Sequence, residues 1–208
     1  IFLPNTIQNI LDQCVENNKL DSKYYEIIIL DDASTDATEE IISSYISIPN
    51  IHYYKNSKQL GIPHSRNKIN NLCNGKYIVV TDDDDIIFNN RIESIVNKLS
   101  YNDGKFAGTN SGWINFNLPE NKIGTFQPGG LMTPETLLFG GGIAMHPVIC
   151  YRKDVILKIK YPEDIPFNSD YSVLAEILCN GYKFINTNSY NIIKIDHKHC
   201  VTNTKPKV

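Results

Sequence analysis

The chain has 208 residues, and its 20 Lys and Arg against 23 Asp and Glu give a formal net charge of −3. This length predicts one globular domain, and the small negative charge argues against general nucleic-acid binding, which needs a basic face. The five cysteines are widely spaced without a CxxC pair, which excludes a disulfide-dense scaffold and indicates reduced thiols. No apolar run approaches the ~20 residues of a membrane span, so we expect no transmembrane segment.

Helix and strand patterns alternate through the first half of the chain. Apolar residues recur along one stripe of the first helix, and short runs that are apolar on both faces are typical of buried parallel strands. In chain order, the patterns predict a helix over 4–18, a strand over 25–30, a helix over 37–47, a strand over 51–54, a helix over 62–74, a strand over 77–80 and a helix over 88–99. This alternation predicts an α/β layered fold with a mixed, mostly parallel central sheet.

The second half of the chain is less regular. Its patterns predict one or two strands over 105–117, a loop over 118–134, a strand over 147–151, a short helix over 152–159, a helix over 170–180, one or two strands over 183–195 and a polar tail over 196–208. We find no internal repeat and no linker, so we predict a single domain over 1–208.

Acidic residues follow two of the predicted strands. Asp31 and Asp32 end the first strand, and Asp82 to Asp85 end the third. Ligands of such sheets bind beyond the carboxyl ends of the strands, so both clusters are candidate site residues. Neighbouring carboxylates repel one another by ~1 kcal/mol at ~4 Å in water, which favours a bound dication with oxygen ligands. The alternative is a solvated turn in which Asp85 caps the next helix.

The order of these motifs resembles the inverting glycosyltransferases of family 2, which have the GT-A fold. The matching segments are EIIILDDASTD (26–36), LGIPHSRN (60–67), NGKYIVVTDDDDII (74–87), HPVICYRKDV (146–155), FNSDYSVLAEILCNGYKF (167–184) and HKH (197–199). The resemblance implies a three-layer, Rossmann-like fold. It also implies a nucleotide-sugar-binding half over 1–100 and an acceptor-side half over 101–208.

The resemblance implies a role for each matching residue on the donor side. Asp32 matches the carboxylate that contacts the nucleobase, and Arg66 matches an arginine near the nucleotide. Asp82 and Asp83 are implied to bind the donor, with Asp84 on the metal. Four aspartates in a row leave the register of this Asp-x-Asp motif open by one residue.

The resemblance also implies the catalytic base and the cofactor. Asp170 matches the aspartate that takes the proton of the acceptor hydroxyl, although Ser169 stands where the family usually has Glu. The alternative is that Asp170 or Ser169 caps the helix. His199, in the H-x-H that begins at His197, is implied to join Asp84 on Mn²⁺ or Mg²⁺.

The chain departs from the family pattern at its beginning. In the family a strand precedes the segment that resembles FLPNTIQNILDQ (2–13), whereas this chain starts at Ile1. We therefore expect a fragment, or another segment in place of that strand. Otherwise the sheet has an open position with unpaired backbone groups.

The resemblance implies the partners as well. The donor is expected to be a UDP-sugar, and the enzyme a hexosyl- or N-acetylhexosaminyl-transferase. The acceptor is a glycan, a lipid-linked molecule or a protein. The expected location is the cytoplasm or the cytoplasmic face of a membrane.

Two other functions stay open at this point. A non-catalytic module that binds sugar nucleotides would suit the altered Ser169-Asp170 pair. A phosphatase of the haloacid-dehalogenase type also places Asp-x-Asp after an apolar strand, but the usual Gly-Thr is missing here, where Asp85 and Ile86 follow.

Overall fold

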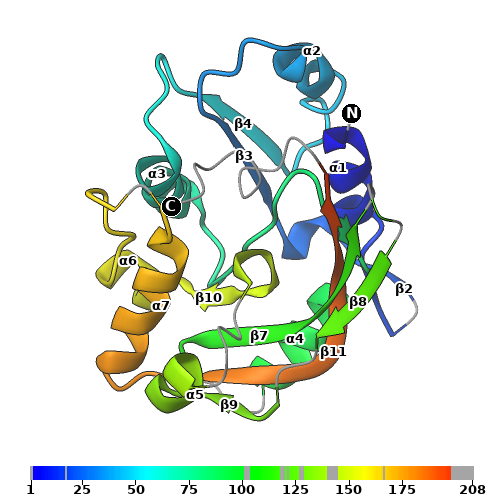
Figure 1. Ribbon diagram of the computed structural model, residues 1–208. Coiled ribbons are helices and arrows are strands. Elements are labelled where there is room, and N and C mark those ends of the chain that lie inside the picture. Colours follow the sequence, from blue (N-terminus) through cyan, green and yellow to red (C-terminus); the bar gives the residue numbers. More distant parts are fainter. Residues whose placement is uncertain are drawn as a thin grey trace.

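A computed structural model describes residues 2–16, 18–100, 104–117, 120, 122–126, 129–139, 145–165 and 167–197 (Figure 1). Its helices are α1 (Leu3–Leu11), α2 (Thr38–Ser43), α3 (Ile62–Leu72), α4 (Arg91–Ser100), α5 (Pro134–Phe139), α6 (Lys153–Lys158) and α7 (Ser169–Cys179). Its strands are β1 (Cys14–Val15), β2 (Asn18–Lys19), β3 (Ile27–Asp31), β4 (Ile51–Lys55), β5 (Tyr77–Val79), β6 (Ile86–Ile87), β7 (Gly108–Asn117), β8 (Lys122–Phe126), β9 (Leu131–Met132), β10 (Cys150–Arg152) and β11 (Phe184–Asp196). Short 3-10 helices span Ser22–Tyr24 and His146–Val148.

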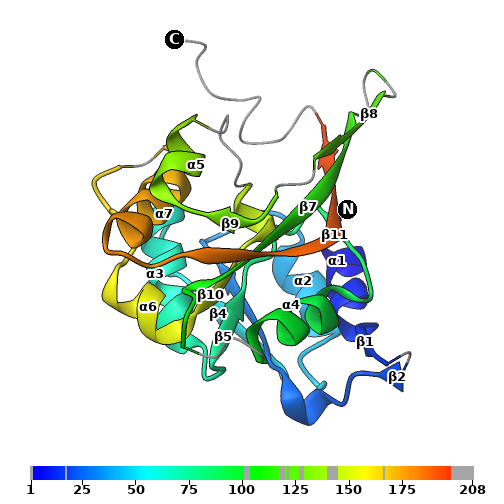
Figure 2. The same cartoon turned by 90° about the horizontal axis from the view of Figure 1, so that it is seen from below.

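The main sheet is mixed, with strand order β5-β10-β7-β11-β6 and with β8 on β7 and β9 on β11. Figures 1 and 2 show α3, α6 and α7 together on one flank of this sheet and α1 on the other. The predicted mixed α/β fold is confirmed, but the prediction that its sheet is mostly parallel is wrong. Within the described residues only β7 with β11 and β3 with β4 pair in parallel. The helical crossover that favours parallel pairing joins β3 to β4, whereas β10 and β8 run against β7.

The β3–β4 pair forms a separate two-stranded sheet. Among the described strands, β3 pairs only with β4 and β5 pairs only with β10. Figure 1 shows the β3–β4 pair between α1 and α3. A cavity of about 610 Å³ is lined by every residue of β3, by the apolar face of α1 and by the turn after β5. The two sheets therefore enclose an open space instead of continuing into one another.

Of the three apolar clusters among the described residues, two form the cores of the two sheets. The larger one packs α6 and α7 against β5, β7, β10 and β11. The smaller one joins α1, β3, α2 and β4 through four buried isoleucines, Ile7, Ile27, Ile42 and Ile51. Burial of each such side chain contributes roughly 2 kcal/mol to the free energy of folding. The β3–β4 sheet thus rests on a small core of its own.

Two predicted segments differ most from the structure. The helix predicted over 4–18 ends at Leu11, and a short hairpin of β1 and β2 follows. Buried Gln13 explains the end, because its amide donates to the carbonyls of Asn9 and Phe88 and accepts from the amide of Ile92. The loop predicted over 118–134 contains β8 and β9 and leads into α5. β8 forms a hairpin with the preceding strand β7, whereas β9 pairs with the distant strand β11, and such pairing outweighs the local loop-like pattern.

Candidate functional site

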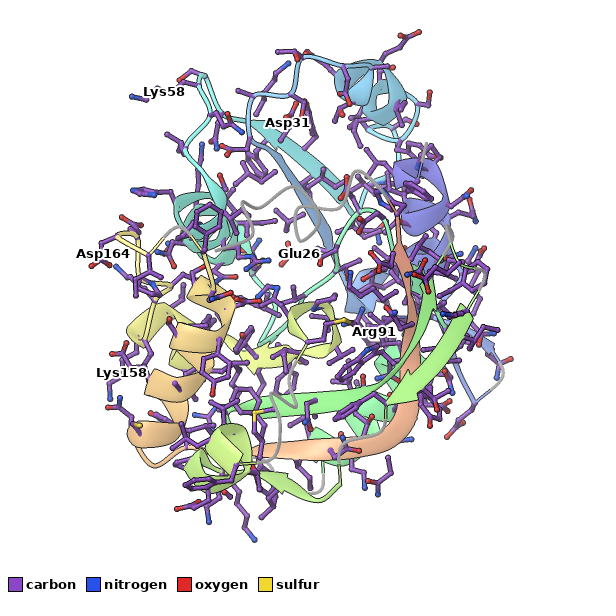
Figure 3. The ribbon with its side chains drawn as sticks, viewed as in Figure 1. Glu26, Asp31, Lys58, Arg91, Lys158 and Asp164 are labelled. Carbon is purple, nitrogen blue, oxygen red and sulfur yellow. The ribbon has the colours of Figure 1, made fainter. Side chains whose placement is uncertain are left out.

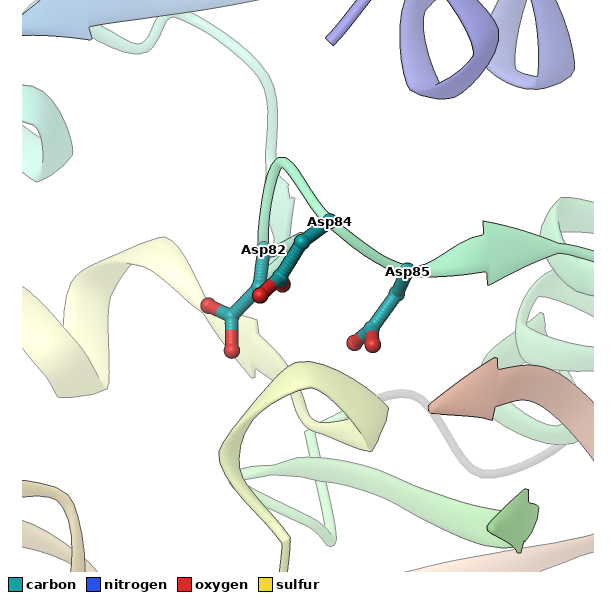
Figure 4. A group of neighbouring side chains, drawn as sticks. All are labelled: Asp82, Asp84 and Asp85. Carbon is teal, nitrogen blue, oxygen red and sulfur yellow. The ribbon is translucent and has the colours of Figure 1, made fainter. Parts of the chain in front are cut away.

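The acidic turn, defined here as Asp82 to Asp85, connects β5 to β6. Carboxylate oxygens of Asp82, Asp84 and Asp85 lie within 4.8 Å of one another (Figure 4). Asp85 is 4% exposed, and its Oδ2 atom has no hydrogen-bond partner. Burial, and next the charges of Asp82 and Asp84, raise the pKa of Asp85 to about 7. An oxygen-ligated dication fits this arrangement, because it would offset repulsion that the carboxylates otherwise relieve by taking up protons.

Two side chains from other elements fix the backbone of this region. The hydroxyl of Thr6, on α1, donates to the carbonyls of Asp83 at 2.9 Å and Asp85 at 3.2 Å. Arg91 is 1% exposed, and its Nη2 atom donates to the carbonyls of Val80 at 2.7 Å and Pro147 at 2.6 Å. Figure 3 shows Arg91 in the interior beside the sheet. The acidic turn is therefore held from both ends before any ligand arrives.

His197 follows β11 and reaches the acidic turn. Its Nε2 atom lies 3.1 Å from Oδ2 of Asp84, and its ring stacks on Phe2 with centroids 4.9 Å apart. The predicted metal ligand His199 lies outside the described residues. The H-x-H spacing was the signal that pointed to this segment, and His197 is the member that the structure describes.

Asp32 lies at the end of β3. Its Oδ1 atom accepts hydrogen bonds from the side chain of Asn56 at 2.7 Å and from the amide of Leu60 at 2.9 Å. Its Oδ2 atom accepts one from the amide of Gly61 at 2.8 Å. Burial raises the pKa of Asp32, but these hydrogen bonds outweigh it and bring the pKa below its ordinary value. The carboxylate is therefore ionised, and it also anchors the start of α3.

Arg66 lies on α3 and faces an aromatic partner. Its guanidinium carbon is 5.6 Å from the ring centroid of Tyr161, a distance that permits a cation–π contact. The hydroxyl of Tyr161 lies 2.6 Å from Nε2 of His146, which is buried. Burial, and next the charge of Arg66, hold the pKa of His146 well below its ordinary value. His146 is therefore neutral and adds no charge beside Arg66.

Asp170 lies in the first turn of α7, which begins directly after Asn168 with its left-handed φ of 60°. The cavity of about 610 Å³ is lined by Asp170 and by the other predicted site residues that the structure describes, namely Asp32, Arg66, Asp82, Asp83 and Asp84. Its volume lies in the range of about 300–1,000 Å³ that is usual for small-molecule sites. The fold thus brings residues from four separate segments to one opening.

Comparison with known proteins shows the family to which the chain is similar. The model described as Glycosyl transferase family 2 matches residues 2–159. An uncharacterised glycosyltransferase of Methanocaldococcus jannaschii is 29% identical over 191 residues, which cover 88% of this chain and 62% of that protein. The Escherichia coli protein UDP-Glc:alpha-D-GlcNAc-diphosphoundecaprenol beta-1,3-glucosyltransferase WfaP is 27% identical over 187 residues, which cover 88% of this chain and 67% of that protein.

Solved structures agree on the fold. S. aureus TarS 1–349 in complex with UDP-GlcNAc matches with a TM-score of 0.75 and 14% identity, over 99% of this chain and 58% of that one. A mannosyltransferase from Pyrobaculum calidifontis in complex with GDP-Man and Mn²⁺ matches with a TM-score of 0.69 and 16% identity, over 96% of this chain and 54% of that one. At these identities the likeness concerns the fold alone. The chain spans 62% of the length of its M. jannaschii relative.

Proposed function

The chain belongs to glycosyl transferase family 2, and from that premise we propose that it moves a sugar from a nucleotide-diphosphate donor to an acceptor hydroxyl with inversion at the anomeric carbon. The observation that carries the proposal is one cavity lined both by the acidic turn and by Asp170. A metal-bound donor and a general base need to meet in one such space. The family shown for the chain is one of glycosyl transferases, which favours sugar transfer over the phosphatase alternative.

The donor is proposed to lie between β3 and the acidic turn. The carboxylate of Asp32 lines the cavity, and each of its oxygens has two lone pairs, so it can accept an N–H of the nucleobase in addition to the amide of Gly61. Arg66 would bind the nucleotide, and Asp82 and Asp83 would bind the ribose side of the donor. We propose a UDP-sugar as donor and a hexosyl- or N-acetylhexosaminyl-transferase as the enzyme class.

The carboxylates of Asp82, Asp84 and Asp85 offer the oxygen ligands that Mn²⁺ or Mg²⁺ prefers. We propose Asp84 as the main ligand, with His199 as a further one. When bound, the ion supplies positive charge against the diphosphate leaving group. Arg91 and Thr6 would keep the acidic turn in place throughout, because their hydrogen bonds go to backbone carbonyls and not to the carboxylates.

Asp170 is the proposed general base on the acceptor side. Its carboxylate would take the proton of the acceptor hydroxyl as the hydroxyl oxygen attacks the anomeric carbon and the bond to the diphosphate breaks. General-base catalysis of this kind contributes about 10²–10⁴ in rate. The acceptor is a glycan, a lipid-linked molecule or a protein. No helix in the described part of the chain has the length and apolar character that crossing a membrane requires.

The test is nucleotide release from a panel of UDP- and GDP-sugars in the presence of Mn²⁺. We expect Asp170→Asn to lower the turnover number by about 10²–10⁴ with nucleotide binding retained. Asp84→Asn should abolish the turnover that added Mn²⁺ supports. The matched control is Asp164→Asn, because Asp164 is exposed and does not line the cavity. Full turnover in both site variants would refute the assignment, and metal-dependent binding without turnover in the wild type would favour the non-catalytic module.

A further inference from the structure

The charges that line the cavity are unbalanced. Six aspartates line it, namely Asp31, Asp32, Asp82, Asp83, Asp84 and Asp170. Among the described lining residues only Arg66 and Lys194 are positively charged, since His146 is neutral. A nucleotide diphosphate brings further negative charge into the same space. Any cation that faces the acidic turn is therefore a candidate to bind the diphosphate, and the family resemblance assigns no role to Lys194.

The sheet places Lys194 beside the acidic turn. β11 pairs antiparallel with β6, with Ile192 opposite Ile87 and Ile193 opposite Ile86. Continuation of this register brings Lys194 next to Asp85, at the point where the chain leaves the turn. Figure 4 shows the reddish end of β11 on the Asp85 side of the group. The backbone amide of Ile195 donates to Asp85, which holds the two segments together at this position.

The surroundings of Lys194 leave its ammonium group available to a ligand. The side chain is half-buried and lines the cavity. Its charge acts on Asp82 and Asp85, whose pKa values it lowers against the dominant effect of burial. No ion pair recorded between described residues involves Lys194, so it is near these carboxylates without being bound to one.

We propose that Lys194 binds the diphosphate of the nucleotide-sugar donor at the acidic turn, as a second cation in addition to Arg66. This inference rests on the proposed function, because it requires a donor with a diphosphate. A lysine ammonium is a compact charge with three donors and a flexible stem, which suits phosphate oxygens that carry changing charge as the sugar departs. Lys194 would bind the donor in the ground state and stabilise the leaving nucleotide afterwards.

The experiment compares ligands that differ only in their number of phosphates. Calorimetry with Mn²⁺ present measures the affinities of uridine, UMP and UDP, and of the matching guanosine series, for the wild type and for Lys194→Met. We expect UDP or GDP to bind Lys194→Met about tenfold more weakly, as the loss of one charge-assisted hydrogen bond implies, with the nucleoside unchanged. Lys194→Arg should restore most of the affinity. Lys158→Met is the matched control, because Lys158 is exposed on α6 and does not line the cavity.

The outcomes separate this inference from the function on which it rests. Equal diphosphate affinity in the wild type and Lys194→Met overturns the role of Lys194 and leaves the proposed function standing. The role of Lys194 is also overturned if Lys194→Met weakens the binding of nucleoside and diphosphate alike. It is overturned too if the substitution only strengthens Mn²⁺ binding without nucleotide, because Lys194 would then merely balance the charge of the aspartates. A wild type that binds neither nucleotide series overturns both proposals. Thermal unfolding of each variant identifies a loss of folding.

Discussion

Asp31 and Asp32 are adjacent, yet their surroundings give them different tasks. Asp31 is 4% exposed, and its carboxylate accepts hydrogen bonds from the amide of Ser34 at 2.7 Å and the hydroxyl of Tyr53 at 2.8 Å. Burial raises the pKa of Asp31, but these hydrogen bonds and nearby Lys55 bring it below its ordinary value. Asp31 is thus a structural residue that fixes the turn after β3, which leaves Asp32 as the candidate for the nucleobase.

This arrangement predicts a pH-dependent stability. Because the pKa of Asp31 is lower in the folded chain than its ordinary value of 3.8, the ionised carboxylate stabilises the fold above about pH 4 and loses this effect as the pH falls through the folded pKa. We expect Asp31→Asn to lower the free energy of unfolding by about 2 kcal/mol at neutral pH. Urea unfolding should show this deficit shrinking as the pH falls below about 4. A deficit that stays constant with pH, or an equal one in exposed Asp164→Asn, would contradict this reading.

Single residues also mark the limit of sequence reasoning. The sequence predicted six site residues because each belongs to a motif with a recognisable spacing. The fold brings all six to one cavity, namely Asp32, Arg66, Asp82, Asp83, Asp84 and Asp170. Arg91 and Lys194 carry no such motif. Arg91 contacts Pro147 and Lys194 lies near Asp85, so their positions depend on pairings between segments far apart in the sequence.

At the scale of elements, Gly108 decides how closely β7 and β10 approach. Gly108 is paired with Tyr151, and a Cβ atom at this position would overlap the carbonyl oxygen of Cys150. That oxygen belongs to the backbone of Cys150, which is fully buried, so neighbouring atoms prevent it from shifting away. The absence of a side chain at Gly108 is therefore a condition for this strand pair.

We expect Gly108→Ala to lower the free energy of unfolding by about 3 kcal/mol, as overpacking of a rigid core does. Gly124→Ala is a matched control, because a Cβ atom on Gly124 meets nothing within 4 Å and that residue also lies in a strand of the same sheet. Urea unfolding of both variants measures the difference. Equal stability of the two would show that β7 and β10 can separate at little cost.

The elements of the first half were predictable because their patterns are local. β3, β4 and β5 are short strand patterns, and α3 lies between β4 and β5, so the predicted segments for these four elements lie within a few residues of the observed ones. The second half was less predictable. β8 and β9 exist through pairing with β7 and β11. β8 carries Gly and polar residues that resemble a loop, and β9 is only two residues long. The wrong prediction of a mostly parallel sheet has the same cause, since the direction of pairing depends on which strands meet and not on the composition of one strand.

At the scale of the whole molecule, the two sheets should differ in stability. The β3–β4 sheet has two strands and a small core of its own, whereas the main sheet has seven strands around the larger cluster. Regions with fewer buried contacts open locally at lower free energy. We expect the amides of β3 to exchange with deuterium at least tenfold faster than those of β7 and β11, which corresponds to about 1.4 kcal/mol.

Ligand binding should reduce the difference in amide exchange rate between the two sheets. A nucleotide and Mn²⁺ at a hundred times the dissociation constant stabilise the state that binds them by about 2.7 kcal/mol. Because β3 lines the cavity, its amides should slow on addition of UDP and Mn²⁺, while those of β8 should not. Hydrogen exchange followed by mass spectrometry checks both expectations. Uniform exchange across the two sheets would contradict the independence of the β3–β4 sheet.

Among the described strands β3 has a partner on one edge alone, and its other edge has a consequence for the behaviour of the protein in concentrated solution. The residues of β3, among them three consecutive isoleucines, are buried or half-buried and line the cavity. An unpaired strand edge is a template on which a polypeptide that enters this space can form backbone hydrogen bonds. Self-association and eventual precipitation would begin there, and not on the charged outer faces of the helices. Whatever covers that edge, whether a nucleotide in the adjoining space or an added strand, therefore also acts as a solubilising agent.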